Sequence, residues 1–280
     1  MNAGFRLHVA LAAICGCLLL TTSAHAELLG YWSGDTNGGA GSTINNDQGN
    51  AALNGALVPG AAWTANAGGH TGLAGDYAVD LPGLDADHVT VPGTGVTFSE
   101  ITITGWINGQ QTGGWTGLIQ SRDDDQPIGI GYRGTSGQLT YTWNNNSDAT
   151  YNFNSGLDIP TDGWAFVALT VTPSQARLYV GTTGAGASLS SATNTIAHMA
   201  QGNPTDWRFG EDNCCGTARN LAGLIDDVAI WDHALSDEEI ASLWDGSQTP
   251  LGPAIPEPST LLLAALGLLG LGFTRRRRRR

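Results

Sequence analysis

Residues 223–244, GLIDDVAIWDHALSDEEIASLW, constrain the fold more than any other stretch of this sequence. The first half alternates in the way a β-strand does, so Leu224, Asp226, Val228 and Ile230 are expected to share one face. A carboxylate would then lie in line with core residues. A buried carboxylate needs a cation or strong hydrogen bonds to stabilise it. We therefore expect Asp226 to take part in a metal site or a hydrogen-bond network.

The second half of the stretch predicts one short helix. Ser236 is a good N-cap, and Glu239 three residues later completes a capping box, so the helix should begin near Asp237. The rest of the chain contains 40 glycines and many Asn, Thr, Ser and Asp, a usage typical of short strands joined by tight turns. The run from Gly181 to Ala192 is interpreted as a mobile loop. We expect an all-β domain with little helix.

Further landmarks occur in order along the chain: Gly30-Tyr31-Trp32 with Asp35, residues 47–50 (DQGN), 101–107 (ITITGWI), 163–169 (GWAFVAL) and 177–180 (RLYV). Together with the closing GLIDDVAIW, they resemble the laminin-G-like, or concanavalin-A-like, domains of secreted bacterial proteins over about residues 28–246. The resemblance implies a two-sheet antiparallel jelly-roll sandwich, closed by the one short C-terminal helix.

Both ends of the chain have the pattern of processing signals. Residues 1–26 combine Arg6, an apolar run and Ala24-His25-Ala26, which predicts a secretory signal peptide and a mature chain that starts at Glu27. At the other end, Pro256-Glu257-Pro258 precedes an apolar segment (residues 261–273) and an arginine cluster (residues 275–280). The motif, apolar segment and basic end of residues 256–280 resemble the PEP-CTERM sorting signal.

The sorting resemblance implies processing by an exosortase near Pro256-Glu257-Pro258, after a stage in which the apolar segment enters the membrane and the arginines stay inside. The alternative is a permanent C-terminal membrane anchor. In either case the protein is expected to be exported by the Sec route to the cell surface, to the outer envelope or to the medium. Residues 27–246 would form one domain, and residues 247–255 a linker.

The charge balance disfavours nucleic acid as a partner. The chain has a formal net charge of −13 and no lysine, and between the two processing signals its arginines are Arg122, Arg133, Arg177, Arg208 and Arg219. Cys214 and Cys215 are adjacent, so they can form a vicinal disulfide but cannot join distant parts of the fold.

No motif for catalysis stands out. Residues 129–134 match G-x-G-x-x-G, but a strand rather than a helix should follow, and we interpret them as part of a hairpin. The paired carboxylates of the glycosidases that share this fold have no counterpart on one strand; Asp123-Asp124-Asp125 is more typical of a solvated loop. We therefore expect a protein that is not an enzyme.

Calcium is the cofactor that the sequence favours. The turn around Asp47 and Asn50 offers carboxylate, amide and main-chain oxygens, and Asp226 would close the cage. In calcium-binding relatives an aspartate of the last strand meets an N-terminal turn. The alternative is that Asp226 accepts main-chain N–H bonds without a metal.

A glycan site is predicted at residues 139–145. Tyr141 and Trp143 share one strand face and are followed by Asn144 and Asn145. Such a surface can bind sugars, because aromatic rings stack on the C–H face of a sugar and amide groups bond its hydroxyls. The alternative is core packing, which we favour slightly for Tyr141 and not for Trp143. The sequence thus predicts a non-catalytic binding module for a polysaccharide of the cell surface or matrix; the alternatives are an adhesive or structural matrix protein and a divergent glycoside hydrolase.

Overall fold

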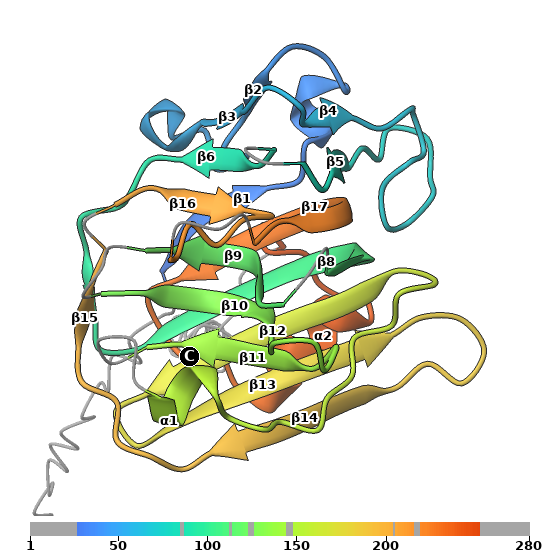
Figure 1. The fold of residues 1–280 in the computed structure, drawn as a ribbon. Helices are drawn as coiled ribbons and strands as arrows, with labels where there is room; N and C mark the ends of the chain where they lie inside the picture. Colours follow the sequence, from blue (N-terminus) through green and yellow to red (C-terminus); the bar gives the residue numbers. More distant parts are fainter. Residues whose placement is uncertain are drawn as a thin grey trace, which may run out of the picture.

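The computed structural model describes residues 27–252, apart from 85–86, 112–113, 123–125, 144–147, 204 and 216–218. The predicted signal peptide and the sorting segment therefore lie outside the described residues. Antiparallel strands form two sheets that stack face to face (Figure 1), so the predicted all-β sandwich is confirmed.

The larger sheet has the strand order β14–β13–β12–β8–β17–β5–β4, and β1 pairs with β17. The long central pair of this sheet is β8 and β17, which are antiparallel. Its strands are β1 (Leu28–Trp32), β4 (Ala62–Trp63), β5 (Val79–Pro82), β8 (Ile101–Gln111), β12 (Ala165–Thr172), β13 (Gln175–Thr182), β14 (Leu189–Asn194) and β17 (Leu221–Trp231).

The smaller sheet has the strand order β11–β10–β9–β16–β6–β3–β2. β10 and β11 pair with each other in an antiparallel hairpin, which confirms the interpretation of the glycine-rich residues 129–134. Its strands are β2 (Thr43–Ile44), β3 (Gly55–Leu57), β6 (Val89–Val91), β9 (Thr116–Ser121), β10 (Ile128–Tyr132), β11 (Leu139–Thr142) and β16 (Trp207–Phe209); β7 (Thr97–Phe98) and β15 (Gln201–Gly202) form a separate pair.

The main core lies between the two sheets. Alternation along β8 directs Ile101, Ile103 and Ile107 into it, where all three are fully buried. The opposite face of β8 carries Trp106 in a second, smaller cluster. The larger sheet is thus packed on both faces.

Helix α2 (Asp237–Trp244) covers the outer face of the larger sheet (Figure 1). It begins where the sequence predicted, with Ser236 and Glu239 forming the reciprocal capping box. Ile240 is completely buried in the second cluster, which stabilises the fold by about 2 kcal/mol. The other helix of the described residues, α1 (Asp148–Tyr151), follows β11, and two short 3₁₀ turns occur at Asp35–Asn37 and Ala51–Leu53.

A β-bulge in β17 corrects the predicted alternation of this strand. Asp226 pairs with Trp106 and Ala229 with Thr104, so two residues of β17 oppose one of β8. Asp227 takes the extra position with a φ of 49°, in the left-handed region. As a result Val228 and Ile230 face the main core, whereas Asp226 lies on the other face with Trp106. The prediction that Asp226 and Val228 share a face is wrong, because a sequence pattern of period two carries no sign of the inserted residue.

Candidate ligand site

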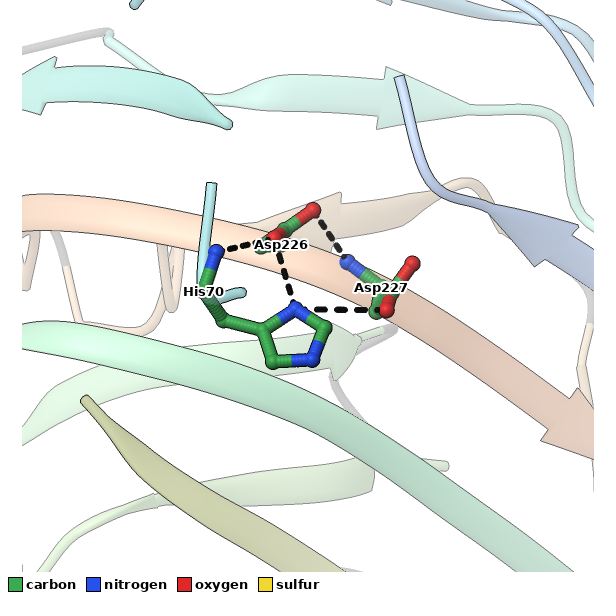
Figure 2. Close-up of side chains that lie close together, drawn as sticks. All are labelled: His70, Asp226 and Asp227. Carbon is green, nitrogen blue, oxygen red and sulfur yellow. Dashed lines mark hydrogen bonds and ion pairs between the residues drawn. The ribbon is translucent and has the colours of Figure 1, made fainter. Parts of the chain in front are cut away.

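The bulge places two carboxylates side by side on the outer face of the larger sheet, and His70 lies against both (Figure 2). The main-chain N–H of His70 donates to Oδ2 of Asp226 over 2.8 Å, and its Nδ1 lies 3.0 Å from the same oxygen. The same ring nitrogen is 3.4 Å from Oδ2 of Asp227. One imidazole therefore bridges two acidic groups that come from the opposite end of the chain.

A compact loop between β4 and β5 holds His70 in place. Asp76 accepts hydrogen bonds from the main-chain N–H and the hydroxyl of Thr71, and the N–H of Gly69 donates to the Asp76 carbonyl. A Cβ at position 69 would overlap the Asp76 carboxylate, so this close approach requires glycine. The loop thus closes on itself directly beside His70.

Aromatic side chains form the floor of the site. The imidazole of His70 stacks on the indole of Trp106, with ring centroids 4.4 Å apart and an interplanar angle of 13°. Tyr31 of β1 donates its hydroxyl to Oδ1 of Asp227 over 2.5 Å. The Trp106 ring thus supports His70, and the Tyr31 hydroxyl orients the carboxyl group of Asp227.

The electrostatics of the site disfavour negative charge. Burial raises the pKa of Asp226 well above its usual range, and the carboxylates of Asp76 and Asp35 raise it further. Burial, followed by the charge of Asp226, raises the pKa of Asp227 to about 7. The pKa of the Tyr31 hydroxyl is also raised, first by burial and then by Asp227. A proton, a cation or a hydrogen-bond donor would stabilise this group.

A cavity of about 420 Å³, here called the His70 pocket, opens beside these residues. One wall is the segment that follows α2, on the way to the C-terminal end of the chain. The rim includes Leu73, whose side chain is 68% exposed. The lining includes Tyr31, Asp35, His70, Asp76, Trp106, Phe166 and Asp227, with Gly246, Gln248, Thr249 and Pro250 from that wall.

The predicted metal ligands are only partly brought together. His70, Asp226 and Asp227 offer ligand atoms within 4.8 Å of one another, so Asp226 does belong to a candidate metal group. Asp47 is not part of it: its carboxylate accepts from the Ser33 N–H and the Thr36 hydroxyl. Asn50 is an N-cap whose side chain accepts from the Ala52 N–H.

The group as arranged does not fit calcium. Calcium takes about six to eight oxygen ligands, and here a ring nitrogen of His70 lies between the carboxylates of Asp226 and Asp227. One imidazole and two carboxylates are instead donors typical of zinc. The alternative weighed from the sequence, hydrogen bonds without metal, also has support, since Asp226 accepts from the main-chain N–H groups of His70 and Asp227.

The predicted aromatic binding surface is wrong. Tyr141 and Trp143 are both 0% exposed and belong to the main core. Their polar atoms are used internally: the Tyr141 hydroxyl contacts His198 and Asn194, and the indole N–H of Trp143 donates to the Met199 carbonyl. The alternative of core packing is thus correct for both rings, because the strand face that carries them is the inner one. Asn144 and Asn145 lie outside the described residues.

Two residues of the site were missed in the sequence. Asp227 was not singled out as a candidate, and His70 has no partner nearby in the sequence. The signals that could have identified them are the adjacent Asp226-Asp227 pair and the Gly-Gly-His-Thr-Gly turn at residues 68–72. Turns of that kind fix main-chain N–H groups close to an acceptor.

Other predictions can be checked only in part. Cys214 and Cys215 are joined in a vicinal disulfide. Pro256, Glu257 and Pro258 lie outside the described residues. Within residues 27–252 as described, no helix is both long and apolar enough to cross a bilayer.

The fold and the site define an antiparallel β-sandwich with a ligand-sized pocket on the outer face of its larger sheet. Residues 83–241 match the family model of the concanavalin A-like lectin/glucanases superfamily, Laminin_G_3, and the chain belongs to this family. Residues 254–279 match the PEP-CTERM protein-sorting motif, which indicates an exported protein directed to the cell surface. A search of curated proteins finds no significant match.

Solved structures share the fold. Domain 4 of AbnA, an extracellular GH43 arabinanase from Geobacillus stearothermophilus solved with arabinotriose, has a TM-score of 0.57 at 20% identity, covering 78% of this chain and 98% of that one. The binding domain of Paraclostridial Mosquitocidal Protein 1 has a TM-score of 0.53 at 16% identity over 79% of this chain and 52% of that one.

Trypanosoma rangeli sialidase has a TM-score of 0.54 at 13% identity, over 81% of this chain and 34% of the sialidase. The likeness therefore spans about half of the toxin domain and a third of the sialidase. At these identities the three likenesses show the fold alone.

Proposed function

We propose that the protein is an exported, non-catalytic binding module that recognises a polysaccharide of the cell surface or extracellular matrix through the His70 pocket. The observation that carries this proposal is the pocket itself. Its volume of about 420 Å³ is in the range of small-ligand sites, and it combines aromatic rings with carboxylate, imidazole, amide and hydroxyl groups. The arabinanase domain solved with arabinotriose, which shares the fold, gives the proposal further support.

The chemistry of the lining suits sugar hydroxyl groups. Asp227 has a side chain that is 21% exposed and keeps its Oδ2 on the His70 side, where an incoming hydroxyl can donate to it. Gln248 and Thr249 offer both donors and acceptors on the facing wall. Phe166 and Trp106 line the base of the pocket but are only 2% and 6% exposed, so we expect the sugar to be held mainly by the polar groups.

The burial and hydrogen bonds of Asp226 favour binding rather than hydrolysis. A glycosidase needs two carboxyl groups that face the scissile bond. The side chain of Asp226 is only 1% exposed; it accepts hydrogen bonds from the main-chain N–H groups of His70 and Asp227 and contacts Nδ1 of His70, so it is not available to a substrate. The divergent-hydrolase alternative predicts release of reducing sugar from polysaccharides, which a colorimetric assay on the purified chain measures directly.

The binding test is a glycan array probed with the full chain, followed by calorimetry on the glycans that bind. At pH 8, where the Asp227 carboxyl is mostly ionised, Asp227→Asn should weaken binding about tenfold or more, because it replaces a charged acceptor by a neutral amide. The matched control is Asp162→Asn, an exposed loop position outside the pocket, which should bind as the wild type does. Equal affinity of Asp227→Asn and wild type would contradict the assignment of the pocket.

A chain that binds none of the glycans would instead favour the adhesive or structural matrix protein. That alternative needs no defined ligand, and sedimentation with isolated matrix in the absence of glycan binding would support it.

The sorting signal implies an exosortase as a partner. We propose that the tail is removed at or near Pro256-Glu257-Pro258 and that the apolar segment contacts the membrane only before this step. Intact-mass measurement of the protein recovered from the cell surface tests this: a mass that includes residues 275–280 would show a retained anchor.

A further inference from the structure

The lining of the His70 pocket carries an excess of negative charge. Three carboxylates line it, those of Asp35, Asp76 and Asp227, and among the described lining residues the one basic side chain is His70. The ring of His70 already lies against the carboxylates of Asp226 and Asp227. The acids of the lining thus outnumber its basic group even when His70 is protonated.

Each of these carboxylates uses one oxygen inside the protein and keeps the other. Oδ1 of the exposed Asp35 accepts a main-chain N–H over 2.9 Å. Oδ2 of Asp76 and Oδ1 of Asp227 each accept a hydroxyl group. Within the described part of the chain, no hydrogen-bond donor reaches the second oxygen of Asp35 or of Asp76, and Oδ2 of Asp227 meets the His70 ring at 3.4 Å. The pocket therefore has spare acceptors.

The imidazole of His70 adds another acceptor. Its Nδ1 faces oxygens of Asp226 and Asp227, so this nitrogen carries the ring proton, and in the neutral ring Nε2 is then an acceptor. Nε2 points away from both carboxylates (Figure 2) and has no hydrogen-bond partner among the described residues. A ligand that supplies donors to this group of acceptors is favoured over one that supplies further acceptors.

The acids of the pocket also act on one another. Burial raises the pKa of Asp35, and the nearby carboxylate of Asp76 raises it further. The pKa of Asp226 is likewise raised first by burial and then by the carboxylates of Asp76 and Asp35. Carboxylates that repel one another in this way are stabilised by a positive charge placed among them. A ligand with hydroxyl groups alone cannot provide that charge.

From these observations we infer that the His70 pocket is specific for a sugar residue with a free amino group, so that the ligand is a polysaccharide with unacetylated amino sugars. This inference rests on the function proposed above and names the class of polysaccharide. A protonated amino group has three N–H donors and no acceptor, which complements the free oxygens of Asp35 and Asp227. Gln248 and Thr249 on the facing wall bond the sugar hydroxyls. N-acetylation removes the charge and adds an acceptor, and both changes weaken binding.

The tetrasaccharides of chitosan, chitin and cellulose test the inference, because they share one linkage and differ in the group on the second carbon of each ring: a free amine, an acetylated amine or a hydroxyl. The test is calorimetry of the full chain at pH 7, with chelator present to keep metal ions out of the pocket. We expect the chitosan tetrasaccharide to bind at least about tenfold more tightly than either of the others, and more weakly as salt is added.

Asp35→Asn locates the binding in the pocket. It keeps an acceptor for the main-chain N–H but removes the charge, and it should weaken binding of the chitosan tetrasaccharide about threefold or more. The matched control Asp162→Asn removes the same charge outside the pocket and should leave the affinity unchanged. This pair of variants separates a specific site from the general attraction of a cation to a chain with a net charge of −13.

If Asp35→Asn fails to fold as judged by circular dichroism, Asp227→Asn takes its place with the same expectation. The inference is overturned if the chitosan tetrasaccharide does not bind, if it binds no better than the other two, or if the pocket variant and Asp162→Asn have equal affinity. Each of these results leaves the proposed function standing as long as the glycan array finds another ligand that Asp227→Asn binds more weakly. An array without any ligand would overturn both.

Discussion

His70 and Asp226, which are 156 positions apart in the sequence, make two contacts to the same oxygen atom: the main-chain N–H and the ring Nδ1 of His70 both lie within 3.0 Å of Oδ2 of Asp226. The pair ties the loop between β4 and β5 to the bulge of β17. The shape of the His70 pocket and its affinity for protons or cations thus depend on the same contact.

This contact leads to a prediction about metal preference. In metal-free protein we expect zinc to raise the melting temperature more than calcium, because a ring nitrogen is one of the three donors. His70→Ala removes the ring nitrogen and should reduce or abolish the advantage of zinc over calcium. Thermal unfolding with each ion and with chelator measures this.

Asp226→Ala should abolish the effect of both ions. A melting temperature of the wild type that neither ion changes would argue that Asp226 functions through hydrogen bonds alone.

The pKa of Asp227 predicts a pH dependence of stability. The folded carboxyl keeps its proton up to about pH 7, whereas in the unfolded chain it ionises near its usual pKa of about 3.9. The folded state binds more protons in this interval, so the free energy of unfolding should fall as pH rises from about 4 to 7. The raised pKa of Asp226 acts in the same direction.

Urea denaturation between pH 4 and 8, with chelator present, measures this slope. Asp227→Asn should have a flatter profile than the wild type over the same interval, while Asp162→Asn should follow the wild type. Parallel profiles for Asp227→Asn and wild type would contradict the raised pKa.

Gly69 is predicted to be essential for the shape of the loop. In Gly69→Ala the new methyl group overlaps the Asp76 carboxylate, so the loop must shift, with a loss of about 1–3 kcal/mol in unfolding free energy and weaker glycan binding. Gly114→Ala is the control, since a Cβ there meets no neighbour within 4 Å. Denaturation and calorimetry on both variants check the expectation; a Gly69→Ala protein as stable as Gly114→Ala would refute it.

Trp143 should matter for stability and not for ligand contact. Trp143→Ala removes a fully buried ring and should lower the unfolding free energy by about 3–5 kcal/mol. Leu84→Ala, at a side chain that is 62% exposed, should change it by less than about 0.5 kcal/mol. If Trp143→Ala were as stable as Leu84→Ala, the ring could not be part of the core.

The sequence was most informative where the signals are local. The capping box at Ser236 located α2 correctly, and the glycine-rich run at residues 129–134 was correctly assigned to a hairpin. Both depend on residues within a few positions of one another, so no knowledge of the tertiary fold is needed. The run from Gly181 to Ala192 was predicted as a loop, but β13 extends to Thr182 and β14 begins at Leu189, because pairing with a neighbour overrides weak local propensity.

The candidate site could be predicted only at Asp226. One inserted residue, Asp227, reverses which face the following side chains occupy, and His70 approaches from a loop with no periodic pattern. The prediction for Tyr141 and Trp143 was wrong for a related reason. Alternation shows that the two rings share a strand face, but it does not show whether that face points to the core or to solvent. Each of these depends on contacts between distant parts of the chain.

Gly246, Gln248, Thr249 and Pro250 form one wall of the His70 pocket, so a ligand bound there, as we propose, would lie beside the C-terminal end of the described chain. Pro256 of the sorting motif follows Pro250 by six positions, a contour of at most about 20 Å. Polysaccharide bound in the pocket would consequently be kept within one short tether of the point at which the chain is cut or attached, so that capture and surface attachment occur at the same end of the molecule.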